Sequence, residues 1–386
     1  MQYRTDKHGN QLSILGLGCM RLPRDKKEAE RIILAAIDGG VNYFDTAYIY
    51  PNNEITVGEI LAKHDKRKDI HIATKMPLFL CKSADDFERF FNEQLMRLQT
   101  DYIDYYFMHS ISSFARWEAL QKMGIEEWIA EKKRLGQIRQ IGFSYHGTCN
   151  DFMKMIESYP WEFCMIQYNY IGENYQAGKK GLLAAAEKGI AVMVMEPLLG
   201  GKLATNLPDQ AIKTFNRANA KLSPADFGLW WLWNQNEVTI VLSGINTTNI
   251  MESNLRSADS FRSLTAEELS VYPDVVSILK KTYKVNCTGC NYCIPCPQGI
   301  NIPACLSAYN AGYTQGYLTG LTLYMTTIAV LSSAPGSPRK CNDCGKCEKI
   351  CPQNIPVRKF LKKTAKRFEL LPIRLAFKVI KKLLNR

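Results

Sequence analysis

The chain has 386 residues, of which 46% are hydrophobic and 22% are charged, so it can bury one large core plus a small second module. Its formal net charge of +12 comes mostly from residues 358–386, which contain eleven Lys or Arg and one acid, Glu369. The rest of the chain is nearly neutral and shows no basic face interleaved with aromatics, which argues against a body that binds nucleic acid.

Thirteen cysteines are many for a chain of this length. Residues 1–7 are polar and show no apolar signal core, so we expect a cytoplasmic protein whose thiols stay reduced. In that compartment, closely spaced cysteines indicate metal binding rather than disulfides.

Residues 1–263 alternate short β-type runs with segments of helical periodicity such as 87–98. Eight strands separated by crossovers predict an α/β fold of the (β/α)8 TIM barrel type. A doubly wound sheet is the alternative, but its fingerprint would need a third glycine after Gly16 and Gly18. Residues 3–13 predict a hairpin across the barrel floor. The expected strands are 14–19, 41–45, 70–73, 103–108, 140–144, 163–168, 190–195 and 238–243.

Four side chains of complementary chemistry fall at or just after predicted strand ends, where barrel enzymes carry their active sites. Asp45 ends the second strand and Tyr50 follows it, while Lys75 and His109 end the third and fourth. A free tyrosine has a pKa of about 10, and a neighbouring ammonium ion lowers that pKa by stabilising the phenolate. We therefore expect Lys75, held by Asp45, to make Tyr50 a proton donor, while His109 orients a carbonyl substrate.

This set resembles the active site of the aldo-keto reductase superfamily, and the resemblance covers roughly residues 1–260. Asp45-Thr46-Ala47, with a tyrosine five residues after the aspartate, is similar to the second-strand signature of that family, which selects Tyr50 rather than Tyr48. The resemblance implies hydride transfer between a nicotinamide coenzyme, NADPH or NADH, and a small carbonyl or alcohol substrate. It also implies coenzyme contacts from Ser144, Gln167, Ser243, Gly244 and Asn254.

Two departures from the family pattern leave the choice between NADPH and NADH open. Many members have a tyrosine after the seventh strand that stacks on nicotinamide, whereas this chain has Met195 and Glu196 there. Many NADPH-dependent members place an arginine near the start of the last helix to pair with the 2′-phosphate, and the aligned residue here is Ile250.

Residues 264–284 are expected to form a helical linker, and no charged residue occurs from 285 to 338. Within that stretch, 317–334 is long enough to be considered as a membrane span, but Thr, Ser and Gly dilute its apolar character. We favour a helix buried between the second module and the barrel.

Residues 285–357 carry two runs of four cysteines, and each run ends in Cys-Pro. The first run has x2, x2, x2 spacing, and the second has the x2, x2, x3 spacing that holds iron–sulfur clusters in bacterial ferredoxins. A zinc site is the alternative, but it normally uses two well-separated Cys-x2-Cys pairs. The runs therefore predict an α-helical ferredoxin-like module with two [4Fe–4S] clusters, with ligands Cys287, Cys290, Cys293, Cys296, Cys341, Cys344, Cys347 and Cys351.

By analogy with two-cluster ferredoxins, the fourth cysteine of each run ligates the other cluster, which joins Cys351 to the first run and Cys296 to the second. With this module the whole chain resembles predicted ferredoxin-fused aldo-keto reductases of anaerobic bacteria and archaea. Nicotinamide transfers two electrons together, whereas each cluster takes one. Either a flavin in the barrel mouth or a flavoprotein partner bridges the two, or the clusters exchange no electrons with the barrel. The redox partner that we expect is a flavoprotein or a ferredoxin.

Residues 358–386 interleave Lys and Arg with apolar side chains, and Pro372 splits them into two short helices. A basic amphipathic tail of this kind predicts docking on the anionic inner face of a membrane or on an acidic partner. A helix that caps the cluster module is an equal alternative.

Together these features predict an oxidoreductase of aldo-keto reductase type that carries two clusters for electron transfer. The alternative is a non-catalytic redox or docking subunit that relays electrons to a flavoprotein and keeps the barrel as a scaffold. The intact set of Asp45, Tyr50, Lys75 and His109 favours the enzyme, because a scaffold has no use for a tuned phenol.

Overall fold

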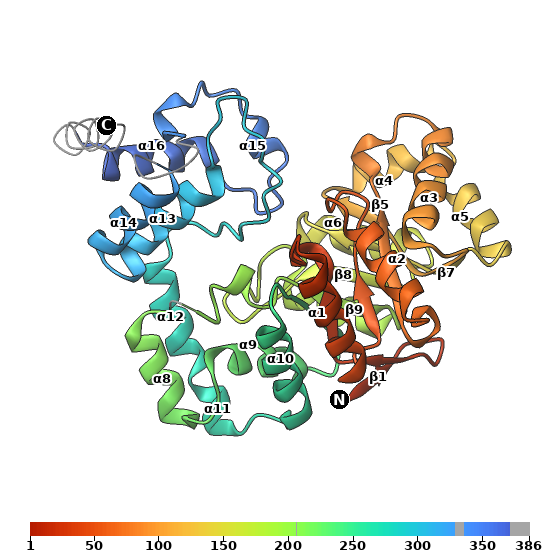
Figure 1. Ribbon diagram of the computed structural model, residues 1–386, viewed down its shortest axis with the longest axis horizontal. Coiled ribbons are helices and arrows are strands. Elements are labelled where there is room, and N and C mark those ends of the chain that lie inside the picture. Colours follow the sequence, from red (N-terminus) through yellow and green to blue (C-terminus); the bar gives the residue numbers. More distant parts are fainter. Residues whose placement is uncertain (206, 329–335, 371–386) are drawn as a thin grey trace. The chain divides into compact units, whose positions relative to one another are not determined.

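The structure is a computed structural model that describes residues 1–205, 207–328 and 336–370 (Figure 1). The chain forms two compact units. One comprises Met1–Leu198 and Asp226–Thr265, and the other comprises Leu199–Ala225 and Ala266–Arg386.

The first unit contains a closed barrel of eight parallel strands, which confirms the predicted fold class (Figure 1). Each strand pairs with the next one in chain order, and β10 closes the ring against β3. The strands are β3 (Leu15–Gly18), β4 (Tyr43–Asp45), β5 (His71–Met76), β6 (Ile103–Ile111), β7 (Ile138–Tyr145), β8 (Phe163–Gln167), β9 (Ala191–Met195) and β10 (Val238–Gly244).

The predicted hairpin is present as β1 (Tyr3–Thr5) and β2 (Gln11–Ser13), which pair antiparallel. Asp6, in the turn between them, accepts hydrogen bonds from the Tyr105 hydroxyl at 2.7 Å and the Gln140 amide at 2.8 Å. Tyr105 packs in the apolar barrel interior, so the hairpin is tied to the barrel from its N-terminal side. The opposite, C-terminal mouth is the end at which barrel enzymes carry their chemistry.

Helices connect the strands and bury their apolar faces around the barrel. In α3 the Ser83 and Asp86 side chains form a capping box, and Phe87, Phe90 and Phe91 recur at helical spacing on the buried side. The helices are α1 (Lys26–Asp38), α2 (Asn53–Lys63), α3 (Ala84–Leu98), α4 (Phe114–Gln121), α5 (Ile125–Arg134), α6 (Cys149–Ser158), α7 (Gly178–Glu187), α9 (Pro224–Trp233) and α10 (Thr248–Ser260), with 3-10 turns at Cys19–Arg21, Arg67–Asp69, Leu78–Leu80 and Leu199–Gly201.

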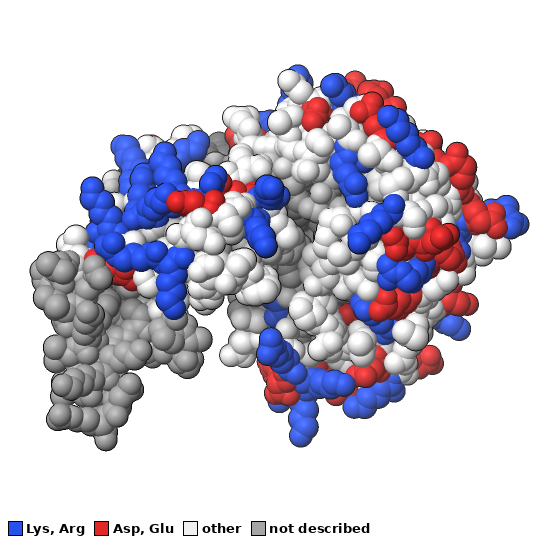
Figure 2. All heavy atoms as spheres, turned by 90° about the horizontal axis from the view of Figure 1, so that it is seen from above, with Lys and Arg blue, Asp and Glu red and all other residues white. Residues whose placement is uncertain are grey.

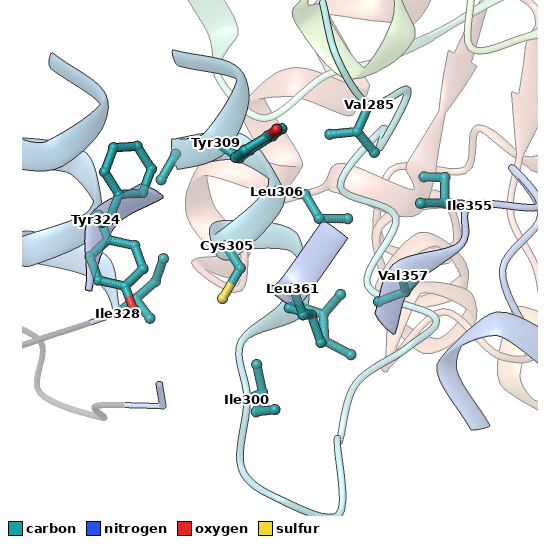
Figure 3. Close-up of a cluster of buried hydrophobic side chains, with 13 residues drawn as sticks. Val285, Ile300, Cys305, Leu306, Tyr309, Tyr324, Ile328, Ile355, Val357 and Leu361 are labelled. Atoms are coloured by element: carbon teal, nitrogen blue, oxygen red, sulfur yellow. The ribbon is translucent and has the colours of Figure 1, made fainter. Parts of the chain in front are cut away.

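The second unit is helical, as the sequence predicted for the cysteine-bearing module. Its core joins α13, α14 and α16 through buried side chains that include Leu306, Tyr324 and Leu361 (Figure 3). Six of the eight predicted cluster cysteines pack against this core. The elements are α8 (Asp209–Asn219), α11 (Ala266–Ser270), α12 (Tyr272–Thr282), α13 (Ile302–Thr314), α14 (Tyr317–Thr327), a 3-10 turn at Pro338–Lys340, α15 (Lys346–Lys349) and α16 (Val357–Phe368).

The helix α8 lies within the sequence range predicted for the barrel, yet it packs in the second unit. The Phe215 ring is 6.0 Å from that of Tyr272 on α12, and Asn219 donates to Glu268 on α11 at 2.7 Å. The segment between β9 and β10 therefore contributes α8 to the second unit. There α8 contacts α11 and α12, which lie in the range predicted as a linker.

Within the described ranges, every helix is too short or too polar to cross a bilayer. Of the stretch considered as a span, 317–334, residues 317–327 form α14, and 329–334 lie outside the described residues. The second half of the basic tail, 371–386, also lies outside them.

Candidate active site and cluster site

Strand register brings the predicted catalytic side chains to one mouth of the barrel. Asp45 pairs with Ala73, and Lys75 pairs with Phe107 on the next strand. Ala73 and Phe107 both lie in the apolar interior. Because side chains alternate along a strand, Lys75 and His109 each point inward two residues beyond an interior residue, at the C-terminal end.

Lys75 and Asp45 form a buried ion pair at the centre of this mouth. The Lys75 ammonium group donates to both Asp45 carboxylate oxygens at 2.7 Å and to the Thr46 carbonyl at 2.6 Å. The two side chains are 2% and 6% exposed. Burial raises the pKa of Asp45 and the Lys75 charge opposes that rise, so the carboxylate and the ammonium hold each other in place.

Tyr50 lies in the turn between β4 and α2, where its backbone N–H donates to the Ala47 carbonyl at 3.0 Å. Its ring centroid is 5.2 Å from the Lys75 ammonium nitrogen and 6.4 Å from the His109 ring, which is nearly perpendicular at 87°. Tyr48, by contrast, donates its hydroxyl to Glu93 on α3 at 2.8 Å. The structure therefore places Tyr50, and not Tyr48, beside the ion pair.

His109 is 5% exposed, and its Nδ1 has no hydrogen-bond partner among the described residues. Burial, followed by the nearby Lys75 charge and His146, holds the pKa of His109 well below its usual value. The imidazole is therefore neutral across the ordinary pH range. A neutral ring can donate a hydrogen bond to a carbonyl oxygen without taking the proton that the oxygen will receive.

His146 is a second histidine in the mouth, and the sequence reasoning missed it. On β7, Gln140 points inward to Asp6, and alternation continues this face through Gly142 and Ser144 to His146. Burial lowers the pKa of His146 to about 4, and its Nδ1 has no partner in the described part of the chain. The signal in the sequence was this alternation, which carries past the expected strand end at 144.

Ser144 and Gln167 are buried at the ends of the adjacent strands β7 and β8. The Ser144 hydroxyl accepts from the backbone N–H of Ser110 at 2.7 Å, and Ser110 has a left-handed φ of 56°. This hydrogen bond joins the irregular end of β6 to β7. It therefore holds the strand end that carries Ser144, one of the predicted coenzyme contacts, in place.

The remaining predicted coenzyme residues meet where β10 leads into α10. Asn254 donates to the Ser243 hydroxyl at 2.8 Å, which ties the helix to the strand end. A Cβ added to Gly244 would lie 2.9 Å from the Arg21 side chain, and one added to Gly18 would lie 3.0 Å from the Ser243 carbonyl. Because these two glycines have no side chain, the backbone beside the Arg21 guanidinium stays accessible. Such a site suits the phosphates of a dinucleotide. Arg21 was not among the residues singled out from the sequence.

An acidic side chain, from α1, binds the first turn of α10. Glu28, on α1, accepts hydrogen bonds from the Thr248 backbone N–H at 2.8 Å and the Thr248 hydroxyl at 2.9 Å. These bonds lower the pKa of Glu28, so it is a carboxylate. Ile250, at the position where an arginine would pair with a 2′-phosphate, is 42% exposed.

Thiols of both cysteine runs lie near one another in the second unit, and which of them share a cluster stays a prediction. Burial raises the pKa of Cys293 to about 12, and the thiols of Cys287, Cys290 and Cys351 add to that rise. A cavity of about 260 Å³ is lined by Cys296 together with Cys341, Cys344 and Cys347, and by Cys293. The donor set therefore fits two four-iron clusters, with Cys351 beside the first run and Cys296 beside the second.

These thiols are not gathered around a single point. In the described ranges, no group of three or more His, Cys, Asp or Glu side chains is close enough to hold one metal ion. A [4Fe–4S] cluster takes one thiolate at each of its four irons, so its ligands stand further apart than those of a single zinc ion.

Comparison with known families assigns both parts of the chain. The sequence model for the aldo/keto reductase family matches residues 14–273, and the model for a 4Fe-4S dicluster domain matches residues 286–355. The first match covers more than half of the chain, so this protein belongs to the aldo/keto reductase family and is an oxidoreductase. The predicted fusion of the two modules is confirmed.

Three similar proteins each match about two thirds of this chain. A Bacillus subtilis protein named an uncharacterized oxidoreductase, YqkF, is 27% identical over 67% of this chain and 90% of its own length. An aldo-keto reductase of Mycolicibacterium vanbaalenii is 30% identical over 68% of this chain and 87% of its own. The solved holo form of aldo-keto reductase AKR11C1 from Bacillus halodurans superposes with a TM-score of 0.60 at 25% identity, over 71% of this chain and 96% of that one.

Proposed function

We propose that this oxidoreductase reduces a small carbonyl compound, or oxidises the corresponding alcohol, with a nicotinamide coenzyme at the Tyr50, Lys75, Asp45 and His109 site. The observation that carries the proposal is the position of Lys75. Its ammonium group is held by Asp45 at 2.7 Å and stands 5.2 Å from the centroid of the Tyr50 ring. A positive charge beside a phenol stabilises the phenolate that forms when the phenol gives up its proton.

In the proposed reaction Tyr50 supplies the proton. A nicotinamide coenzyme, once bound, would supply a hydride to the carbonyl carbon. As negative charge develops on the carbonyl oxygen, the Tyr50 hydroxyl donates its proton to that oxygen, and the phenolate left behind is stabilised by the Lys75 charge. Asp45 keeps Lys75 oriented, and neutral His109 hydrogen-bonds the oxygen and fixes the direction of approach. The alcohol oxidation is the reverse.

For the coenzyme we propose NADH over NADPH. One similar protein, from Schizosaccharomyces pombe, is named aldo-keto reductase yakc [NADP(+)], and it is 27% identical over 53% of this chain. This chain has Ile250 in place of the arginine that the resemblance led us to look for, and the Glu28 carboxylate already takes the Thr248 amide. A 2′-phosphate near this turn would face a carboxylate and find no cation at Ile250.

The two clusters are proposed to pass single electrons between the enzyme and a redox partner. A nicotinamide hydride carries two electrons and a cluster carries one, so a flavin, within the barrel mouth or on the partner, is the group that would divide the pair. We propose a cytoplasmic enzyme that works with a flavoprotein or a ferredoxin.

The test is an anaerobic assay of the purified holoenzyme. Iron, acid-labile sulfide, flavin and nicotinamide are measured on the same sample, and oxidation of NADH and of NADPH is followed with a panel of small aldehydes and ketones. We expect coenzyme oxidation that depends on the carbonyl compound, and about eight irons per chain. If the irons are present but no carbonyl compound or alcohol turns over, the alternative of a non-catalytic redox subunit replaces this proposal.

A further inference from the structure

The described end of the second unit carries a concentration of positive charge that residues 1–335 of the sequence lack. Residues 336–370 contain ten Lys or Arg and three Asp or Glu. Figure 2 shows Lys and Arg gathered over one part of the surface, whereas elsewhere on that side they alternate with acids. We name the exposed lysines that make no ion pair with a described residue the basic face: Lys340, Lys346, Lys349, Lys359, Lys363 and Lys366.

All three acids of this segment are already engaged by other cations. Arg358 binds Glu348 at 2.7 Å, Lys362 binds Asp343 at 2.8 Å, and Arg339 binds Glu369 at 2.9 Å. The charges of the basic face are therefore not neutralised within the described part of the chain. A field of one sign extends from such a surface over about 10 Å at 0.1 M salt and attracts partners of the opposite charge.

Two lysines of the basic face line hollows that reach the second run of cysteines. Lys346 lines the same cavity as Cys344 and Cys347. Lys366 lines a neighbouring hollow that reaches Cys341. Cys344 is exposed, and so is Ile350, with 47% of its surface accessible. An exposed apolar residue beside the proposed cluster, with lysines around it, has the layout of an apolar interface centre with a polar rim.

The apolar side of α16 is not available to a lipid bilayer. Val357, Leu361 and Phe368 are each at most 2% exposed and belong to the core shared with α13 and α14 (Figure 3). An interfacial membrane helix needs its apolar face free to enter the headgroup region. Of the three uses weighed for the tail, this helix therefore serves as the cap of the cluster module, and what it offers to a partner is charge.

We propose that the basic face docks an acidic one-electron carrier protein over the cluster of Cys341, Cys344 and Cys347. The proposal rests on the electron-transfer role proposed above and names the surface and the chemistry of the partner. Docking here brings the carrier against the exposed Cys344, which keeps the transfer distance short. Attraction between the lysines and the acidic carrier raises the association rate and makes it depend on salt.

The test measures binding of the anaerobically purified holoenzyme to an acidic two-cluster ferredoxin across a range of salt concentrations. The test variant is Lys349→Glu, Lys363→Glu and Lys366→Glu together. The control, Lys68→Glu, Lys122→Glu and Lys180→Glu, makes the same charge change at exposed lysines of the first unit. At low salt we expect the test variant to weaken binding at least about tenfold and to flatten the salt dependence, and the control to change it less than about twofold.

Iron content is measured on each variant, so loss of binding with iron retained reflects the surface rather than damage to the module. Equal weakening by both variants, or no binding of the ferredoxin by the wild type at low salt, overturns the proposal. Binding to anionic vesicles but not to the ferredoxin also overturns it and replaces the carrier with a membrane. Carbonyl reduction is assayed separately without a carrier, so failure of the barrel chemistry is distinguishable from failure of docking.

Discussion

Lys75 donates to both carboxylate oxygens of Asp45 at 2.7 Å while the whole pair is buried at the barrel mouth. Two charges removed from water are costly unless each is fully paired. The Thr46 carbonyl accepts a third hydrogen bond from Lys75, which completes its donors. The Lys75 ammonium group is therefore a positive charge held at a fixed position near Tyr50, because both members of the ion pair lie at strand ends.

Tyr50→Phe removes the proposed proton donor and keeps the ring in place. We expect turnover of carbonyl compounds to fall by about 10²- to 10⁴-fold, the range that general acid catalysis contributes. Iron content and cluster absorbance should stay at the wild-type level, because Tyr50 lies in the first unit and the cysteines lie in the second. The measurement is steady-state coenzyme oxidation with the best carbonyl substrate.

Tyr48→Phe is the matched control for that change. The Tyr48→Phe variant loses the hydrogen bond that the Tyr48 hydroxyl donates to Glu93, which is not part of the proposed site. The activity of this variant should therefore remain close to that of the wild type. Wild-type turnover in Tyr50→Phe, or equal losses in the two variants, would show that the tyrosine has been assigned wrongly.

Stability should decline below neutral pH because the mouth histidines are held neutral. Burial lowers the pKa of His146 to about 4, and the pKa of His109 also lies well below its usual 6.5. Below about pH 6.5 the two histidines bind protons in the unfolded chain but stay neutral in the folded chain. Their contribution to the free energy of unfolding is therefore complete above that pH and is lost as the pH falls. Each histidine can contribute a slope of about 1.4 kcal/mol per pH unit within its window.

His146→Gln isolates one of these contributions. Chemical denaturation at a series of pH values should show a flatter decline for the variant than for the wild type between pH 6.5 and 4. Parallel curves for the two proteins would contradict the buried neutral histidine.

The sequence was sufficient for the parts of the structure that repeat or that carry a local motif. The eight apolar runs predicted the barrel, and the spacing from Asp45 to Tyr50 selected the tyrosine beside Lys75. The end of β6 was harder to predict. The expected strand stopped at Met108, but a register shift and the left-handed Ser110 carry the strand on to Ile111.

What the sequence left open was settled by packing. The apolar stripe of α16 suits a membrane surface and a protein core equally, and only the contacts of Leu361 and Phe368 distinguish them. His146 is a single histidine in a polar segment, and it becomes notable only when the inward face of β7 is followed to its end. Residues 206–220 were interpreted as a loop near the pocket, but 209–219 form α8, and the sequence could not say that Phe215 would meet Tyr272.

Ile250→Arg should shift the coenzyme preference toward NADPH. The new guanidinium can pair with the 2′-phosphate, and charge-assisted bonds of this kind are strong. We expect the ratio of kcat/KM for NADPH to that for NADH to rise about tenfold, which corresponds to about 1.4 kcal/mol. Ile250→Gln, of similar length but without charge, is the control and should leave the ratio unchanged.

A second change tests the same assignment from the opposite side. Glu28→Gln keeps an acceptor for the Thr248 amide and removes the negative charge. It should also raise the NADPH to NADH ratio. If neither Ile250→Arg nor Glu28→Gln alters the ratio, the turn at the start of α10 does not read the 2′ position.

The cluster pairing can be tested by counting iron in serine variants. With cross-linked pairing, Cys287 and Cys351 hold the same cluster, so Cys287→Ser with Cys351→Ser should lose no more iron than either change alone, and about four irons remain. Cys287→Ser with Cys296→Ser should disable both clusters and leave little iron. Pairing within each run predicts the reverse order for the two double variants. Iron and labile sulfide, measured per chain after anaerobic purification, decide between the two arrangements because each double variant carries the same number of substitutions.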